Sequence, residues 1–250
     1  SQTVVELSRR TIRAVEAPGG LAPALAFVRL VYGAPLAERL RDRARPEGQP
    51  EVTVQPPDLL AALTPVVDAL DELGVAYRLG GSVASSAHGL PRSTVDIDLV
   101  AELVPEHVAG LVARLRDSYY IEPDAVRRAI ATRSSFNVIH LATMLKVDVF
   151  VPKGRPFDRE AARRAAPHPL EEAPAARAFV IASPEDVILA KLEWYRAGGE
   201  VSERQWYDVL GVLRVKGPAL DFAYLERWAA ELDVGDLLRR ARAEAGAAAE

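Results

Sequence analysis

The chain has 250 residues, of which 49% are hydrophobic and 26% are charged, the ordinary balance of a folded globular protein. Its 31 Lys and Arg residues against 35 Asp and Glu residues give a net charge of −4, so the overall charge does not indicate nucleic-acid binding, and any such contact would have to be a local patch. Cysteine is absent from the sequence, which excludes disulfides, thiolate metal sites and cysteine nucleophiles.

The sequence also bears on location. No apolar run reaches the ~18 residues of a transmembrane helix, so we expect no membrane span. The first residues, Ser1-Gln2-Thr3, do not begin the basic segment and apolar core that are typical of a signal peptide. We therefore expect a cytoplasmic protein.

Residues 1–57 form the first of three regions. Apolar positions at helical spacing predict two short helices, separated by a break at Pro18-Gly19-Gly20. Four prolines and a glycine then interrupt residues 46–57, which predicts a linker. Because this region is too short to bury a core of its own, we interpret it as an N-terminal helical extension with a proline-rich linker.

Residues 58–156 alternate between helical and strand patterns, which predicts an α+β fold with a small mixed β-sheet and helices on one side. The spacing of apolar residues and turn signals predicts helices over 58–73, 82–88 and 105–117, and strands over 75–79, 94–100, 136–140 and 145–151.

From residue 157 to residue 250 the pattern turns helical. Ser183 suits a helix N-cap and Pro184 the first helical position, with Glu185 and Asp186 in the first turn. We predict helices over 184–197, 202–214 and 221–246, and interpret residues 157–250 as a C-terminal helical domain.

Acidic residues on two predicted strands are the strongest indication of chemistry. Asp96 and Asp98 are two residues apart, so both point to one face of their strand, while Ile97 points to the other. Carboxylates this close repel each other, and a divalent cation would remove that repulsion. Mg²⁺ is usually held by one or two carboxylates and substrate phosphates. Asp148, a single acid on a later strand, could add a third carboxylate and suit a pair of metals in phosphoryl transfer.

A glycine turn lies just before the first of these acids. Gly80 and Gly81 stand between a predicted strand and a predicted helix, where backbone N–H groups can approach phosphate oxygens. Ser82 could donate its hydroxyl to the same phosphate. Arg92 and Thr94 share a strand face with Asp96 if the strand begins early, and either contact phosphate or stabilise the turn.

Gly-Gly-Ser, then Asp-x-Asp on a strand, then a later Asp on another strand resembles the nucleotidyltransferase superfamily with the polymerase-β-like fold. The chain is similar to its minimal bacterial members and to the AbiEii/AbiGii-type toxins. The resemblance covers about residues 60–151. It implies that Gly81 and Ser82 contact phosphate, that Asp96 and Asp98 bind metal, and that Asp148 is the third acid.

Two predicted helices extend the resemblance. Lys191, and Arg204 with Asp208, look like the lysine helix and the Arg-x-x-x-Asp helix of the AbiEii-like group, whose residues lie near the nucleotide. Arg204 and Asp208 are four residues apart and so are neighbours on one helix face. Read from the residues alone, Arg204 and Asp208 could equally form a surface ion pair, and Lys191 could pair with Asp208, Glu185 or Glu193.

The resemblance implies transfer of a nucleoside monophosphate from an NTP to an acceptor, with Mg²⁺ as cofactor and Mn²⁺ as an alternative. A toxin would use tRNA or another RNA as acceptor and would have an antitoxin protein as partner. The alternatives are a small-molecule nucleotidyltransferase of the antibiotic-modifying kind and a non-catalytic nucleotide-binding module. A basic surface beside the acids would favour RNA, whereas an acidic cleft would favour a cationic drug. The nucleotide, the acceptor and the oligomeric state are left open.

Overall fold

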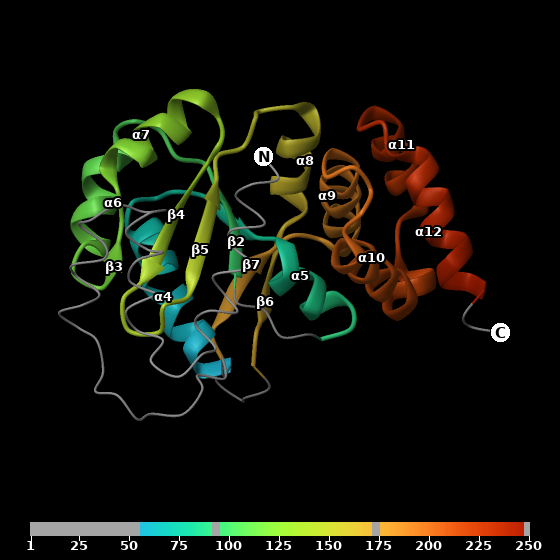
Figure 1. Cartoon of the computed structure of the whole chain (residues 1–250), viewed down its shortest axis with the longest axis horizontal. Helices are drawn as coiled ribbons and strands as arrows, with labels where there is room; N and C mark the ends of the chain where they lie inside the picture. The colour runs from blue at the N-terminus through green and yellow to red at the C-terminus, as the bar shows by residue number, and fades with distance from the viewer. Residues whose placement is uncertain (1–55, 92–95, 172–175, 248–250) are drawn as a thin grey trace. The chain divides into compact units, whose positions relative to one another are not determined.

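The computed structural model describes residues 56–91, 96–171 and 176–247 (Figure 1). The helices and most of the linker expected in residues 1–57 lie outside these ranges, as do Arg92 and Thr94. No helix within the described ranges combines the length and the apolar character needed to cross a membrane.

Helices and strands alternate through the first two thirds of the described chain. In order they are α4 (Pro56–Glu72), β1 (Tyr77–Leu79), α5 (Gly81–His88), β2 (Asp96–Ala101), α6 (His107–Leu115), β3 (Tyr119–Tyr120), α7 (Pro123–Thr132), β4 (Ser135–His140), β5 (Lys146–Phe150), α8 (Pro156–Arg164), β6 (Ala166–Pro169) and β7 (Ala178–Ile181). The predicted elements of the core region are confirmed, with shifted ends, whereas β3 and α7 were not predicted.

The seven strands form one sheet in the order β3-β4-β5-β2-β1-β7-β6. Strand β2 runs parallel to β5, and β1 runs parallel to β7, while the other neighbours are antiparallel. The sheet is therefore mixed, as predicted, and the fold is α+β. Strands β6 and β7 lie in residues 157–250, where only helices were expected. Because β6 contains Pro167 and Pro169, the sequence pattern does not predict a strand there, but a strand at the edge of a sheet tolerates proline.

Helices form the rest of the chain: α9 (Pro184–Ala197), α10 (Glu203–Lys216), a 3₁₀ turn at Gly217–Ala219, α11 (Phe222–Glu231) and α12 (Gly235–Ala247). The predicted cap of α9 is confirmed, because the Ser183 hydroxyl accepts a hydrogen bond from the backbone N–H of Asp186 at 3.2 Å. The single helix predicted over 221–246 is wrong. The chain breaks it near Asp233, whose φ of 55° is left-handed and cannot continue a right-handed helix.

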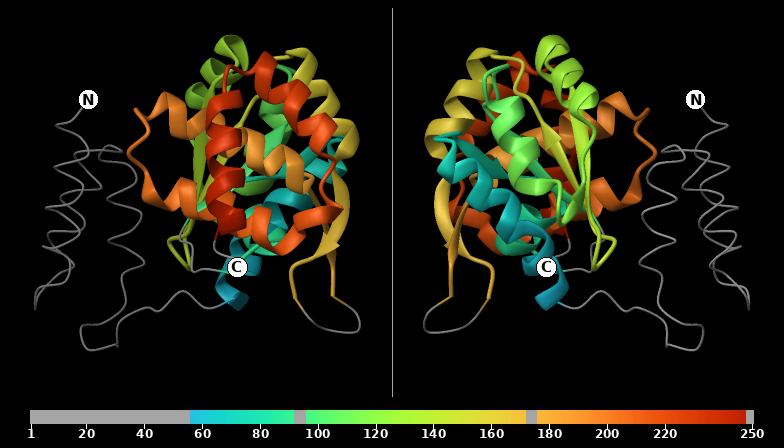
Figure 2. Two further views of the ribbon diagram at one scale, coloured as in Figure 1. Left: turned by 90° about the vertical axis from the view of Figure 1, so that its right-hand side faces the viewer. Right: turned by 90° about the vertical axis from the view of Figure 1, so that its left-hand side faces the viewer.

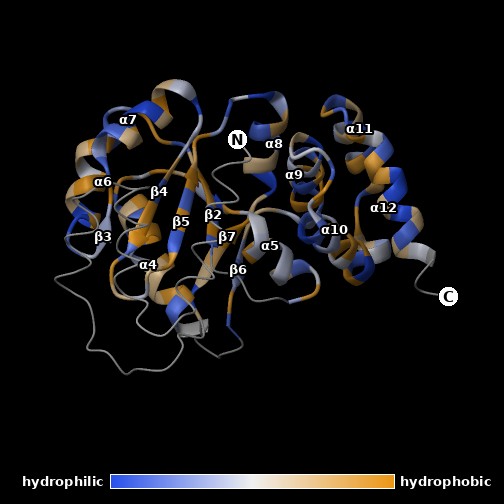
Figure 3. Cartoon of the chain, in the orientation of Figure 1, coloured by the Kyte–Doolittle hydropathy of each residue, from blue (hydrophilic) through white to orange (hydrophobic). Residues whose placement is uncertain are grey.

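The two faces of the sheet differ in chemistry. On β2 the side chains of Ile97 and Leu99 are fully buried, and on β5 those of Val147 and Val149. Helix α4 contacts β5 and α6, and its Leu63 belongs to the same core. Figure 2 shows α4, α6 and α7 from one side and α11 and α12 from the other. Figure 3 shows hydrophobic residues both in the strands and on the helices, and a hydrophilic stretch on β5.

The opposite face carries the alternate residues of the same strands, among them Asp98 and Asp148. Helix α5 contacts β2 and α9, and α9 packs on α10. The polar face of the sheet therefore looks toward α5 and the C-terminal helices, and the candidate site lies there.

Candidate active site

The turn between β1 and α5 holds one of the predicted acids in place. Gly80 is extended and donates its N–H to the Asp98 carbonyl at 2.9 Å. Gly81 begins α5 with a φ of 53°, a conformation that glycine adopts at little cost. A Cβ atom at Gly81 would lie 1.7 Å from Oδ2 of Asp98, whereas one at Gly80 would meet nothing within 4 Å. Position 81 therefore requires glycine because the Asp98 carboxylate lies directly against it.

Register brings the acids of two strands side by side. Asp98 on β2 is the direct partner of Asp148 on β5, and Asp96 is the partner of Lys146. Because β2 and β5 are neighbours and all four residues share one face, three carboxylates and one ammonium group meet on the polar side of the sheet. The Lys146 Nζ atom lies 2.8 Å from Asp148 Oδ2 and 3.5 Å from Asp96 Oδ1.

Asp98 differs from the other two acids because its carboxylate makes no hydrogen bond or ion pair with any residue in the described ranges. Burial, reinforced by the nearby charge of Asp148, raises the pKa of Asp98. Burial also raises the pKa of Asp148, against the effect of its hydrogen bond from Lys146. The sheet thus places two partly buried carboxylates side by side, and their like charges repel each other.

These carboxylates fit a divalent cation that shares its ligands with phosphate. Among the described residues, no group of three or more His, Cys, Asp or Glu side chains is arranged to hold a metal, so the three-carboxylate site expected from the sequence is not preassembled. Mg²⁺ needs only one or two carboxylates when substrate phosphates supply other oxygens. The unpartnered carboxylate of Asp98, with Asp148 beside it, meets that need. Asp96, paired with Lys146, remains a candidate ligand.

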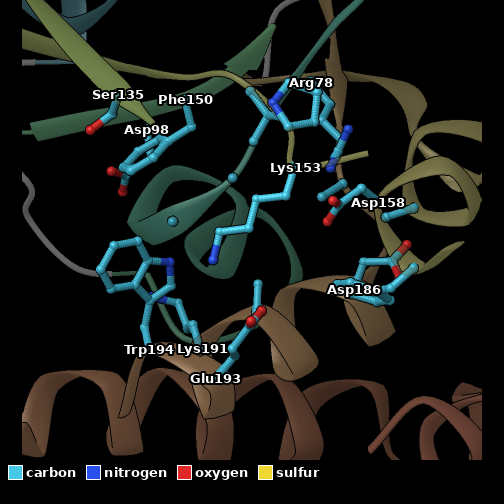
Figure 4. A pocket seen from close by; sticks show the side chains of 18 of the residues that line it. Arg78, Asp98, Ser135, Phe150, Lys153, Asp158, Asp186, Lys191, Glu193 and Trp194 are labelled. Atoms are coloured by element: carbon cyan, nitrogen blue, oxygen red, sulfur yellow. The ribbon is translucent and has the colours of Figure 1, made fainter. Parts of the chain in front are cut away.

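A cavity of about 540 Å³ opens beside Asp98 (Figure 4). One wall consists of the polar face of the sheet and the glycine turn, and the other of α8 and α9. Its lining includes the polar and aromatic residues Arg78, Gly80, Gly81, Asp98, Arg133, Phe150, Lys153, Arg155, Asp158, Asp186, Lys191, Glu193, Trp194 and Gln205.

Three cations of the lining have no carboxylate partner within hydrogen-bonding or ion-pairing distance among the described residues: Arg78, Arg133 and Lys153. Arg78 is the direct partner of Val100 across β1 and β2, so it shares the face of Asp98. Burial lowers the pKa of Arg78, although Asp186 and Asp158 act through space in the opposite direction. Figure 4 shows the Lys153 side chain reaching into the cavity. These cations can receive an anionic ligand.

The charged side chains of the helical wall are hydrogen-bonded or ion-paired to one another and to neighbouring hydroxyls. The guanidinium group of Arg155 lies 2.5 Å from the carboxylate of Glu193 on α9 and 2.9 Å from that of Asp158 on α8. Asp186 receives hydrogen bonds from the hydroxyls of Tyr224 and Ser183, at 2.6 Å and 2.7 Å.

Lys191 and Asp208 form an ion pair between α9 and α10. The Lys191 Nζ atom lies 2.7 Å from Asp208 Oδ2, and both side chains are only 4% exposed. Lys191 also donates to Oε1 of Gln205 at 3.1 Å. Of the two alternatives for Arg204 and Asp208, the surface ion pair does not form between them, because Asp208 turns inward to Lys191. Arg204 is exposed on α10 and does not line the cavity.

The remaining predicted residue, Ser82, is buried in the first turn of α5, and its hydroxyl donates to the Asp96 carbonyl at 3.4 Å. Its contact with phosphate stays a prediction. Lys146, Arg78, Lys153 and Phe150 were not predicted from the sequence. The first two could have been found, because Lys146 is two residues from Asp148, and Arg78 alternates with the buried Leu79. Lys153 lies beyond the end of β5, where no periodicity applies.

Searches with this chain find no matching protein-family model and no matching curated protein. Among solved structures, the chain is similar to ANT(2'')-Ia in complex with adenylyl-2''-tobramycin, at 16% identity and a TM-score of 0.46, over 70% of this chain and 97% of that one. It is also similar to the lincosamide antibiotic adenylyltransferase LnuA with bound lincomycin, at 16% identity and a TM-score of 0.39, over 64% and 98%.

A third similar structure is an antigenic nucleotidyltransferase-like protein from Paracoccidioides brasiliensis, at 17% identity and a TM-score of 0.42, over 74% of this chain and 94% of that one. By their names, these three solved structures are nucleotidyltransferases or resemble them. At these identities and TM-scores the likeness concerns the fold alone, and the activity has to follow from the site itself.

Proposed function

We propose that this protein transfers a nucleoside monophosphate from an NTP to an acceptor hydroxyl and depends on Mg²⁺. The observation that carries the proposal is the pair Asp98 and Asp148, which are direct partners on neighbouring strands. Gly81 lies against Asp98, and the cavity in front contains three cations that have no carboxylate partner among the described residues. Carboxylates for a metal, backbone N–H groups at a helix start and free cations together suit a nucleoside triphosphate.

In the proposed reaction the acceptor oxygen attacks the α-phosphorus of the NTP. A new oxygen–phosphorus bond forms, the bond from the α-phosphorus to the bridging oxygen breaks, and pyrophosphate leaves with the electron pair. Mg²⁺, when bound, supplies positive charge that neutralises the phosphates. Asp98 and Asp148 would hold that cation, and Asp148, whose pKa burial raises, would accept the proton of the attacking hydroxyl. Most of the catalysis is positioning and charge neutralisation, as in phosphoryl transfer generally.

The cations of the cavity that have no carboxylate partner favour an anionic acceptor over a polycationic one. Arg155 is shared by Asp158 and Glu193, and Lys191 is paired with Asp208, whereas Arg78, Arg133 and Lys153 make no ion pair with any described residue. A cationic antibiotic would meet these cations, whereas the phosphates of an RNA would be attracted to them. We therefore propose RNA as the acceptor, with tRNA as the form that a toxin of this kind would modify and an antitoxin as its partner.

Labelled nucleotides test the proposal directly. The protein is incubated with each α-labelled NTP, Mg²⁺ and total RNA, and the products are separated by size. Asp98→Asn is the inactive variant, and Asp117→Asn makes the same chemical change at a side chain that is 90% exposed. We expect label in RNA with the wild type and with Asp117→Asn, and none with Asp98→Asn or with a chelator.

Other outcomes separate the alternatives. Label in an added aminoglycoside or lincosamide rather than in RNA would replace the acceptor but keep the reaction. Nucleotide binding that depends on Asp98, without transfer to any acceptor, would indicate a non-catalytic binding module. Transfer that survives Asp98→Asn would show that the carboxylates have been assigned the wrong role.

A further inference from the structure

The three tryptophans of the chain differ in how much of the side chain is exposed. Trp206 is 7% exposed, donates its N–H to Glu244 at 2.9 Å and packs on Tyr195 with ring centroids 5.1 Å apart. Trp228 is 3% exposed and packs on Phe157. Trp194 is 58% exposed, although it stands on α9, a helix most of whose residues are buried. Core packing therefore does not account for Trp194.

Trp194 faces an aromatic residue on the opposite wall of the cavity. Its ring centroid is 5.9 Å from that of Phe150, and the two rings are inclined at 67°. Phe150 is two residues beyond Asp148 on β5 and so points to the same side of the sheet. Both rings line the cavity that contains Asp98, and Figure 4 shows Trp194 and Phe150 on the side of Asp98, with Arg78 and Asp158 farther along.

The lining of the cavity thus contains both an apolar surface and cationic side chains. Val100, the direct partner of Phe150 on β2, extends the apolar surface on the floor, and Ala190 and Ala197 of α9 extend it on the wall. Unpaired cations line the same cavity. A ligand that fills both parts must combine several negative charges with a flat apolar ring, and a nucleoside triphosphate has both.

We propose that Phe150 and Trp194 form a stacking subsite for the base of the nucleotide substrate, an inference that rests on the proposed function. The exposed face of the indole is offered to the base, and the Phe150 ring sets the depth to which the base enters. Because every base has a π face, stacking of this kind binds bases with little discrimination. The subsite therefore contributes affinity and orientation, and all four NTPs should bind within about tenfold of one another.

The test compares a ligand that has a base with one that lacks it. ATP and inorganic triphosphate, each with Mg²⁺, are titrated into the full chain by calorimetry and by tryptophan fluorescence. The variants are Trp194→Leu, which removes the ring, and Trp194→Phe, which restores one. The control is Trp206→Phe, with the buried ring changed instead. Circular dichroism confirms that each variant is folded.

We expect ATP, but not inorganic triphosphate, to quench the emission of the exposed Trp194. Trp194→Leu should bind ATP about 10- to 100-fold more weakly, the range that one stacked base supplies, while inorganic triphosphate binds it as it binds the wild type. Trp194→Phe should recover most of the affinity, and Trp206→Phe should bind both ligands like the wild type.

Two results would overturn the inference, and they are distinguishable. If Trp194→Leu binds ATP like the wild type while Asp98→Asn does not, the base lies elsewhere and the proposed function stands. If the wild type binds neither ATP nor inorganic triphosphate, the proposed function fails and the stacking subsite fails with it.

Discussion

The two walls of the cavity satisfy their charges in opposite ways. On the helical wall, Lys191 is matched by Asp208 and Arg155 by Glu193, each within 3 Å. On the sheet wall, Asp98 has no partner among the described residues and faces Asp148. Ion pairs within a wall stabilise the folded protein without a ligand. Neighbouring carboxylates repel each other, and a ligand that binds between them stabilises the fold. We therefore assign stability to the helical wall and ligand binding to the sheet wall.

Breaking the pair on the helical wall should have the largest effect. Lys191→Met removes the ammonium group that lies 2.7 Å from the buried Asp208 carboxylate and should cost about 3–5 kcal/mol of unfolding free energy, measured by urea denaturation. The double variant Lys191→Met with Asp208→Leu should recover most of the loss, because two apolar side chains leave no buried charge. If stability holds while the affinity for Mg²⁺-ATP drops tenfold or more, Lys191 is a nucleotide ligand and the helical wall is not self-contained.

The glycine turn comes next. Gly81→Ala combines a left-handed φ with a Cβ that collides with Asp98, and should lower the unfolding free energy by about 1–3 kcal/mol and abolish Mg²⁺-nucleotide binding by displacing the carboxylate. Gly80→Ala is the matched control, with open space around the added atom and an unchanged thermal midpoint. Equal losses in the two variants would mean that the turn, rather than the contact with Asp98, requires glycine.

A smaller effect, of opposite sign, is expected at Asp98. Its pKa is raised in the folded state above the ordinary value of 3.8, so the folded state holds the proton more tightly than the unfolded state. Stability should therefore fall as pH rises through the interval from 3.8 up to the folded-state pKa. Asp98→Asn should gain stability over the wild type above that interval and lose the stabilisation by Mg²⁺-nucleotide. Urea unfolding across the pH range measures both, and a loss of stability at neutral pH would make Asp98 structural.

The smallest effect is expected at Arg204. Its side chain is exposed and lies outside the cavity, and Asp208 pairs with Lys191 instead of with Arg204. Arg204→Ala should change the unfolding free energy by no more than about 0.5 kcal/mol and leave nucleotide affinity unchanged in calorimetry. A tenfold loss of affinity would extend the binding surface onto α10.

Local patterns predicted the parts of the fold and the site that depend on neighbours along the chain. The cap at Ser183 and the shared face of Asp96 and Asp98 follow from periodicity and capping chemistry alone. The pairing of Lys191 with Asp208 depends on how α9 packs against α10, so the sequence could offer it only as an alternative. Lys146 lies within the acid cluster because of strand register, which spacing along one strand does not reveal.

Other misses have local causes. Helix α7 was overlooked because residues 123–132 are polar and offer only a narrow apolar stripe, with Val126 and Ala129 buried. Strand β6 carries two prolines in four residues, a composition typical of a loop. Its place at the edge of the sheet removes the need for the N–H groups that proline lacks. The proposed base subsite depends on the meeting of β5 with α9, which no sequence pattern records.

The parallel pairing of β1 with β7 limits how the protein can be cut. A fragment ending at residue 156 would omit β6 and β7 and leave β1 as an unprotected sheet edge, whose free N–H and C=O groups invite pairing with other chains. Such a fragment should aggregate even though it contains Asp96, Asp98 and Asp148. Ser183 caps α9 almost directly after β7 ends at Ile181, so the connection is too short for α9 to be replaced by a helix of another protein. The smallest fragment that keeps the sheet intact therefore includes the C-terminal helices.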